Sequence, residues 1–121
     1  MTDAMTHTVL LIEDEEDLRE LMREALELNG YTVVTAKEGT EALERLAHIG
    51  LPCLILLDLL MPGMNGWDFF DKVRSRPELA AVPVIVHSSA SDRAPKDVTR
   101  VLQKPLVLDR LLSTVQEYCA H

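Results

Sequence analysis

Cysteine is scarce in this sequence, with only Cys53 and Cys119 among 121 residues. The two do not have the spacing of zinc ligands, and two cysteines are too few for the disulfide framework of a small secreted protein. We therefore interpret both as small hydrophobic side chains buried in the core. Neither a zinc site nor a disulfide framework is expected.

Long apolar runs and basic residues are also lacking. No segment approaches the roughly 20 apolar residues that cross a bilayer, and the first seven residues lack the basic start and apolar run of a secretion signal. Acidic residues outnumber Lys plus Arg by 20 to 12, and the resulting net charge of −8 disfavours binding to nucleic-acid phosphates. The sequence therefore predicts a cytoplasmic protein that binds neither membranes nor nucleic acid.

What is present suits one globular domain. A chain of 121 residues, of which 47% are hydrophobic, is long enough to bury a core of its own. We predict that residues 1–7 are a disordered N-terminal segment and that residues 8–120 form the domain. The apolar stripe of the last helical segment is explained by packing within the chain, so we expect a monomer or a weak dimer.

Short apolar runs alternate with helical patterns along the chain. Strands are predicted at 8–12, 32–36, 53–57, 84–87 and 98–102, and helices at 18–28, 40–48, 67–76 and 108–119. A further helix between the last two strands is expected to be short or irregular, because residues 91–97 include a proline and almost no apolar stripe. Apolar strands separated by helices are typical of a doubly wound α/β fold, here with a five-stranded parallel sheet and helices on both faces.

Polar residues gather directly after four of the predicted strands. Glu13 and Asp14 follow the first strand, Asp58 the third, Ser88 the fourth and Lys104 the fifth. Ligands of doubly wound sheets bind at this carboxyl edge. An acidic run alone is typical of a solvated loop, but Asp58 directly follows a buried strand, where a carboxylate needs a cation or hydrogen bonds.

The chemistry of these groups predicts phosphoryl transfer to Asp58. Crowded carboxylates suit Mg²⁺, which prefers hard oxygen ligands and neutralises charge as a phosphate donor approaches. A carboxylate that attacks phosphorus forms an acyl phosphate. Lys104 would supply further positive charge, and the hydroxyl of Ser88 could hydrogen-bond a phosphoryl oxygen.

Four motifs in this order resemble the receiver domains of bacterial two-component response regulators, and the resemblance covers nearly the whole chain. The motifs are Leu11–Asp14, Leu57–Gly66, Pro83–Ser88 and Lys104–Pro105. The resemblance implies a stand-alone receiver domain with the flavodoxin-like strand order 2-1-3-4-5. It also implies that the proline after the lysine is typically cis.

The resemblance also implies roles for individual residues. Asp58 would take a phosphoryl group from a sensor histidine kinase or a histidine phosphotransfer protein, and the signal would pass to a downstream protein effector. Asp14 and Asp58 would ligate Mg²⁺ directly, Glu13 through water, and Leu60 through its backbone carbonyl. Ser88 would move toward the phosphoryl group and Lys104 would pair with it.

The sequence departs from the family on the signalling face. The family has an aromatic residue three positions before the lysine that rotates on activation, whereas this chain has Val101. The stretch between the hydroxyl and the lysine is also short. We therefore predict that phosphorylation of Asp58 is not coupled to an aromatic rotation in this protein.

Two alternative functions remain open at this stage. One is a degenerate receiver that binds partners without phosphorylation, and the other is a phosphohydrolase with Asp58 as its nucleophile. Such enzymes usually have a second Asp two residues after the first, where this chain has Leu60. His87 could likewise be a pH sensor or a phosphotransfer histidine, although a partly covered structural residue is the simpler interpretation.

Overall fold

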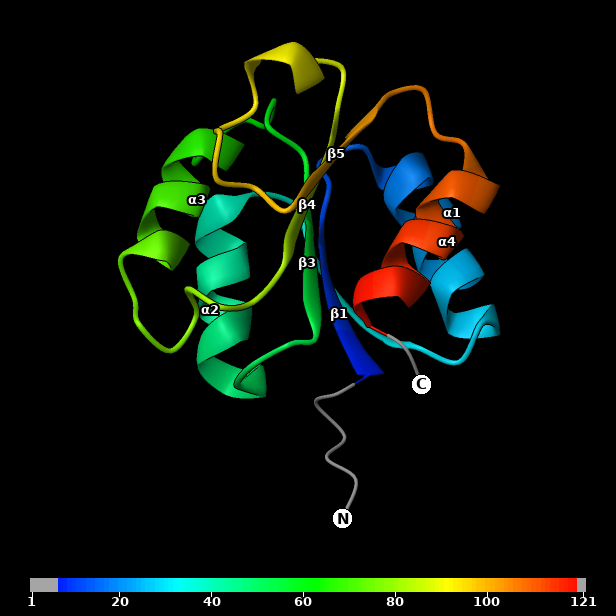
Figure 1. The fold of residues 1–121 in the computed structure, drawn as a ribbon, viewed down its shortest axis with the longest axis horizontal. Helices are drawn as coiled ribbons and strands as arrows, with labels where there is room; N and C mark the ends of the chain where they lie inside the picture. Colours follow the sequence, from blue (N-terminus) through cyan, green and yellow to red (C-terminus); the bar gives the residue numbers. More distant parts are fainter. Residues whose placement is uncertain (1–6, 120–121) are drawn as a thin grey trace.

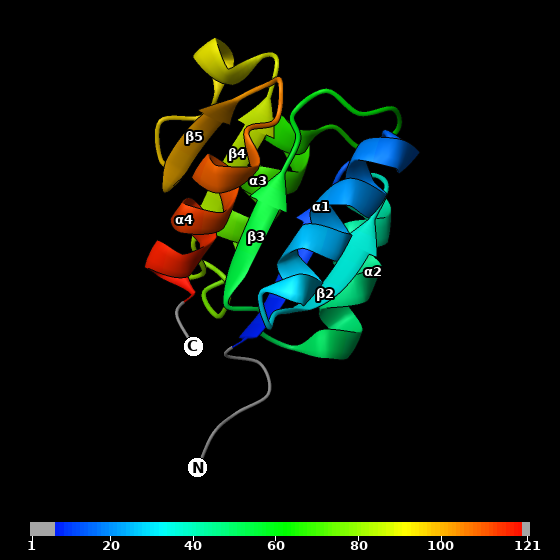
Figure 2. The ribbon, with the colours of Figure 1, turned by 90° about the vertical axis from the view of Figure 1, so that its right-hand side faces the viewer.

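A parallel sheet lies between two layers of helices in the computed structural model, which describes residues 7–119 (Figures 1 and 2). The strands are β1 Thr8–Ile12, β2 Thr32–Ala36, β3 Leu54–Leu57, β4 Val84–Ser88 and β5 Arg100–Gln103. The helices are α1 Glu16–Leu28, α2 Gly39–Ile49, α3 Gly66–Arg74, α4 Leu108–Tyr118 and the short 3₁₀ helix η2 Ser91–Arg93. Of the segment 1–7 that we predicted to be disordered, residues 1–6 lie outside the described part.

The five strands are parallel and follow the order β2-β1-β3-β4-β5. This confirms the predicted doubly wound fold and the flavodoxin-like order. The register pairs Ile12 with Leu57, and the backbone N–H of Asp58 donates to the carbonyl oxygen of Ile12 at 3.1 Å. The residues that follow β1 and β3 therefore leave the sheet side by side.

Alternation along the strands divides the core into two halves. Leu10 and Ile12 face α2 and α3, whereas Val9 and Leu11 face α1 and α4 (Figure 1). Because all four side chains are 0–1% exposed, β1 has no solvent-facing side. This double burial explains why the strands are apolar throughout instead of alternating with polar residues.

The connection between β4 and β5 contains only η2, which confirms the expected short fourth helix. The fifth strand begins at Arg100, two residues later than predicted. Val98 instead packs against the small buried cluster of Leu59, Val86 and Ala90, and Thr99 ends the loop through bonds with Val84. The hydroxyl of Thr99 accepts from the N–H of Val84 at 3.0 Å, so these apolar-looking residues close the loop rather than extend the strand.

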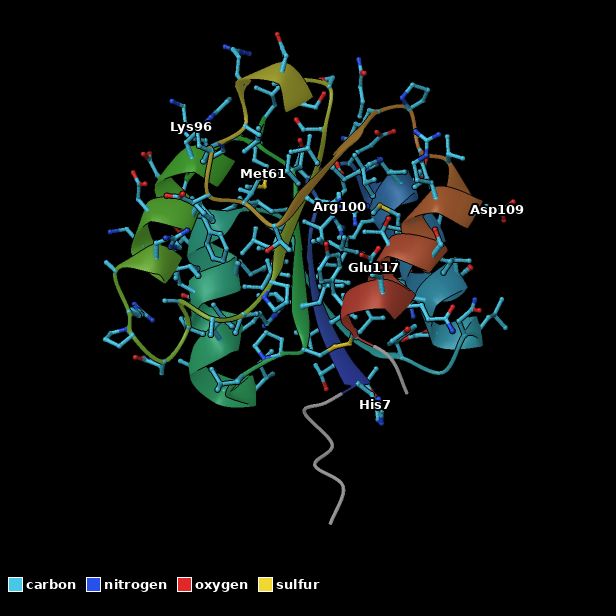
Figure 3. The ribbon with its side chains drawn as sticks, in the orientation of Figure 1. His7, Met61, Lys96, Arg100, Asp109 and Glu117 are labelled. Atoms are coloured by element: carbon cyan, nitrogen blue, oxygen red, sulfur yellow. A yellow bond between two sulfur atoms is a disulfide. The ribbon has the colours of Figure 1, made fainter. Side chains whose placement is uncertain are left out.

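The two cysteines form a disulfide, so our interpretation of them as simple hydrophobic side chains was wrong, although Cys119 is buried in the core as expected and Cys53 is partly buried. Cys53 immediately precedes β3 and Cys119 immediately follows α4, with a Cα–Cα distance of 5.6 Å. Figure 3 draws the bond in yellow, near the end of α4 and the amino-terminal ends of the strands. Sequence spacing gave no signal for this pair, because 66 positions separate the two residues and only the fold brings them together.

Candidate functional site: an acidic edge with one lysine

Three carboxylates meet at the carboxyl edge of the sheet. Glu13 and Asp14 follow β1 and Asp58 follows β3, and one carboxylate oxygen of each lies within 4.8 Å of the others. Glu13 and Asp58 are 1% and 3% exposed, whereas Asp14 is exposed. The structure therefore brings together the three side chains that the sequence proposed as a metal site.

Lys104 reaches this cluster from the loop after β5. Its Nζ lies 3.1 Å from Glu13 Oε1 and 3.2 Å from Asp58 Oδ2. Burial alone would lower the pKa of Lys104, but hydrogen bonds and charge from Glu13 and Asp58 raise it overall. Lys104 is therefore a charged ammonium that bridges two buried carboxylates. The peptide between Lys104 and Pro105 is cis, as the resemblance implies.

One ammonium does not balance three carboxylates. Burial, together with the negative charge of Asp58, raises the pKa of Glu13 to about 7. A carboxylate with such a pKa lacks sufficient positive charge around it. The oxygen-only donors and this uncompensated charge fit a hard divalent cation such as Mg²⁺.

Backbone groups orient the carboxylate of Asp58 and the hydroxyl of Ser88. The N–H of Leu60 donates to Asp58 Oδ1 at 3.2 Å, so Oδ1 is held by the loop while Oδ2 meets Lys104. The hydroxyl oxygen of Ser88 accepts from the N–H of Ala90 at 3.1 Å. Ser88 is fully buried at the end of β4, the strand beside Asp58. The proposed metal contact of the Leu60 carbonyl stays a prediction.

His87 is more deeply buried than the sequence indicated. It is 3% exposed, and neither ring nitrogen has a hydrogen-bond partner. The ring borders a small cavity whose lining includes Leu106 and Arg110. Burial, aided by the charge of Lys104, lowers the pKa of His87 to about 4, so the imidazole is neutral at pH 7. A period-two reading of β4 could have placed this side chain on the α4 face of the sheet, but not its lack of partners.

A largely apolar pocket of about 610 Å³ lies beside Lys104. Its walls include Leu18 and Leu21 from α1 and Pro105 and Leu106 from the loop before α4. Leu21 is 49% exposed. No pattern in the sequence indicates this pocket, because its two walls are far apart in the chain.

The doubly wound sheet and its acidic carboxyl edge define the class as an α/β domain with a candidate metal site at the carboxyl ends of its strands. Within this class, the chain belongs to the response regulator receiver domain family, whose model matches residues 9–116. Among curated proteins, it is similar to the polar-differentiation response regulator DivK of Brucella ovis. The two are 29% identical over 120 residues, which cover 94% of this chain and 97% of that protein.

Solved structures agree with the family assignment. A putative response regulator from Chloroflexus aurantiacus is 27% identical, with a TM-score of 0.86, and the match covers 95% of this chain and 98% of that one. The response regulator protein TrrA from Thermotoga maritima, in complex with Mg²⁺-BeF, is also 27% identical. Its TM-score is 0.81, and the match covers 92% of this chain and 97% of that one.

The family membership confirms the predicted class of function, phosphoacceptor signalling in two-component systems. Neither the degenerate receiver nor the phosphohydrolase is favoured. Among residues 7–119, no helix is long and apolar enough to cross a membrane.

Proposed function

We propose that Asp58 accepts a phosphoryl group from a phosphohistidine on a sensor histidine kinase or a histidine phosphotransfer protein. The observation that carries this proposal is the meeting of three carboxylates and Lys104 at one edge, with Asp58 buried between them. Glu13, Asp14 and Asp58 are the residues that would hold Mg²⁺, with the carbonyl of Leu60. When bound, the ion neutralises negative charge between the donor phosphate and the acceptor carboxylate.

The side chains of Asp58, Lys104 and Ser88 would carry out the transfer itself. An oxygen of Asp58 attacks phosphorus, the P–N bond of the donor breaks, and the departing imidazole nitrogen keeps the electron pair and takes a proton. Lys104 is within hydrogen-bond distance of Asp58 Oδ2, so its ammonium is placed to pair with the new phosphoryl group. Ser88 would give up the bond from Ala90 and donate its hydroxyl proton to a phosphoryl oxygen.

The pocket beside Lys104 suits the phosphodonor protein. Its apolar wall from Leu18, Leu21 and Leu106 adjoins the acceptor site, so a bound helix would bring its phosphohistidine near Asp58. The phosphorylated domain would then signal by contact with a downstream protein effector. We propose that the protein acts in the cytoplasm as a monomer or weak dimer, and that it assists only its own phosphorylation and dephosphorylation.

Phosphorylation with a small donor tests the role of Asp58. Incubation with acetyl phosphate and Mg²⁺ is expected to add one phosphoryl group, measured by intact mass, and the Asp58→Asn variant should gain none. Asp17→Asn, which changes an exposed acid of α1 outside the three-carboxylate cluster, is the matched control and should label normally. Normal labelling of Asp58→Asn would contradict the proposal.

Removal of the metal tests the acidic cluster. Chelation of Mg²⁺ should slow the labelling of the wild-type protein by about 100-fold or more, because a bound ion contributes several kcal/mol to transition-state stabilisation. The measurement is the rate of mass gain at fixed acetyl phosphate. Equal rates with and without the chelator would show that these carboxylates act without a metal.

A further inference from the structure

The disulfide between Cys53 and Cys119 lies at the amino-terminal end of β3, away from the phosphoacceptor. Cys53 precedes β3, whereas Asp58 follows the same strand at its other end. We propose that Cys53 and Cys119 form a redox-responsive pair, opened by a dithiol reductant and closed by exchange with a disulfide such as oxidised glutathione, which accepts the two electrons and leaves as two thiols. The state of the pair determines how firmly the last turn of α4 is held. This activity goes beyond phosphorylation and does not depend on it.

Exposure favours Cys53 as the sulfur that is attacked. Cys53 is partly exposed, whereas Cys119 is 3% exposed and packs among buried residues of the α1 and α4 face. The backbone of Cys53 is also fixed, since its N–H donates to the carbonyl oxygen of Thr8 at 2.8 Å. The greater exposure of Cys53 therefore favours attack at this residue over attack at the buried Cys119.

The exchange proceeds by two displacements. A thiolate of the dithiol attacks Sγ of Cys53, the S–S bond breaks, and the sulfur of Cys119 leaves as a thiolate that takes a proton. The second thiol of the reductant then attacks the reductant's other sulfur, which is bonded to Cys53 in the mixed disulfide. This releases Cys53 as a thiol, and the reductant leaves as a cyclic disulfide. Two electrons and two protons pass to the protein.

The other contacts of α4 indicate what the open form retains. Leu111 and Val115 are buried against the sheet, so the middle of the helix stays docked without the disulfide. The last turn is also held by packing of Tyr118 against the core and by Arg100, which pairs with Glu117 at 3.0 Å and donates to the Tyr118 hydroxyl at 3.1 Å. Such half-exposed ion pairs stabilise little, so reduction is expected to loosen mainly the last turn.

The proposed cytoplasmic location gives the pair a physiological reason to open. Disulfides in reducing compartments are usually transient or redox-sensing rather than permanent. The disulfide also closes a loop of the chain that contains Asp58, Ser88 and Lys104. Opening of the bond would therefore release a covalent constraint on the segment that carries these three residues, while the loosening stays mainly in the last turn of α4.

Equilibration in glutathione buffers tests reversibility. The folded protein is incubated at a series of ratios of reduced to oxidised glutathione, with dithiothreitol as the dithiol probe, and is then alkylated and weighed. We expect complete and reversible conversion between the disulfide and two free thiols. A disulfide that persists in the folded protein under excess dithiothreitol, or thiols that do not reoxidise, would overturn the proposal.

Hydrogen exchange tests the consequence for α4. Amides of the last turn, including that of Cys119, which bonds to the carbonyl oxygen of Val115, should exchange at least about tenfold faster in the reduced wild type than in the oxidised one. Glu117→Gln, which keeps the disulfide but weakens the ion pair with Arg100, should change exchange less. Equal exchange in the two redox states would sink the proposed coupling.

Two further measurements separate this inference from the proposed function. The double variant Cys53→Ser with Cys119→Ser should show the fast exchange in both buffers; slow exchange would contradict the proposal. Labelling of Asp58 by acetyl phosphate is measured in parallel. Loss of labelling would count against the phosphoacceptor role alone, and loss of redox-dependent exchange against the disulfide alone.

Discussion

The buried imidazole of His87 lowers the stability of the folded protein. The ring is buried in β4, and neither ring nitrogen has a partner, so its polar atoms have lost water without a replacement. Burial, then the nearby ammonium of Lys104, both lower the pKa of the imidazole, and only Asp58 opposes them. The neutral ring is therefore the form that the folded protein accommodates.

We expect this residue to make the protein less stable in mild acid. The pKa of His87 is about 4 in the folded chain and near 6.5 when unfolded, so below pH 6.5 the unfolded chain binds the extra proton. The contribution of His87 to stability should therefore fall between about pH 6.5 and pH 4, by up to about 3 kcal/mol. Glu13 acts in the opposite direction, because its pKa of about 7 lies above the ordinary value of 4.5 and the folded chain binds that proton more tightly than the unfolded chain does. Urea unfolding of His87→Leu across this range should show a much smaller loss.

The matched control is His48→Gln. His48 is exposed on α2, with Nδ1 2.9 Å from the carbonyl oxygen of Glu44, so this variant should keep the acid sensitivity of the wild type. If His87→Leu loses as much stability between pH 6.5 and pH 4 as the wild type, the imidazole of His87 does not set the acid response.

At the scale of elements, the connection between β4 and β5, which contains only the short helix η2, is fixed to α3. The indole N–H of Trp67 donates to the carbonyl oxygen of Arg93 at 2.9 Å, and the guanidinium of Arg93 lies 5.5 Å from the centre of the indole ring. Beneath η2, Leu59, Val86 and Ala90 form a small buried cluster. These contacts hold the segment that begins just after Ser88.

Removal of the indole N–H should weaken this attachment. Trp67→Phe keeps an aromatic ring for Arg93 but loses the hydrogen bond, and we expect a loss of about 1 kcal/mol in the free energy of unfolding. Hydrogen exchange of the amides between residues 91 and 98 should become faster, while exchange in α2 stays unchanged. Unchanged exchange in this segment would mean that the buried cluster holds η2 without Trp67.

The same element offers a route for the signal that does not need an aromatic residue at Val101. Movement of Ser88 toward a phosphoryl group would break its bond from Ala90, and η2 begins at the next residue. We therefore expect Trp67 fluorescence to change when acetyl phosphate and Mg²⁺ are added. The change should be absent in Asp58→Asn, and a constant emission during full labelling of the wild type would exclude this route.

At the scale of the whole molecule, the disulfide constrains more than half of the chain. It joins residues 66 positions apart, and closure of such a loop lowers the entropy of the unfolded chain enough to contribute about 4 kcal/mol in the loop-entropy model. The double variant with serine at both cysteines should therefore unfold at a clearly lower urea concentration. The reduced wild type is the control and should unfold near the double variant, and all three should label at Asp58.

The element order and the candidate site followed from the sequence, because both depend on local signals. Strands buried on both faces are apolar throughout, amphipathic helices repeat every three to four residues, and parallel strands bring their carboxyl ends to one edge. Glu13, Asp14, Asp58 and Lys104 were therefore expected together, and the structure places them together. Their chemical roles remain predictions that the labelling experiments test.

Long-range packing decided the rest. Cys53 and Cys119 meet only because β3 and α4 are neighbours in space, and the apolar pocket exists only where α1 faces the loop after Lys104. Whether the ring nitrogens of His87 find hydrogen-bond partners depends on all the elements packed around the ring, and they find none. Local sequence patterns do not predict these long-range contacts, because each contact joins residues that are far apart in the chain and come together only in the folded protein.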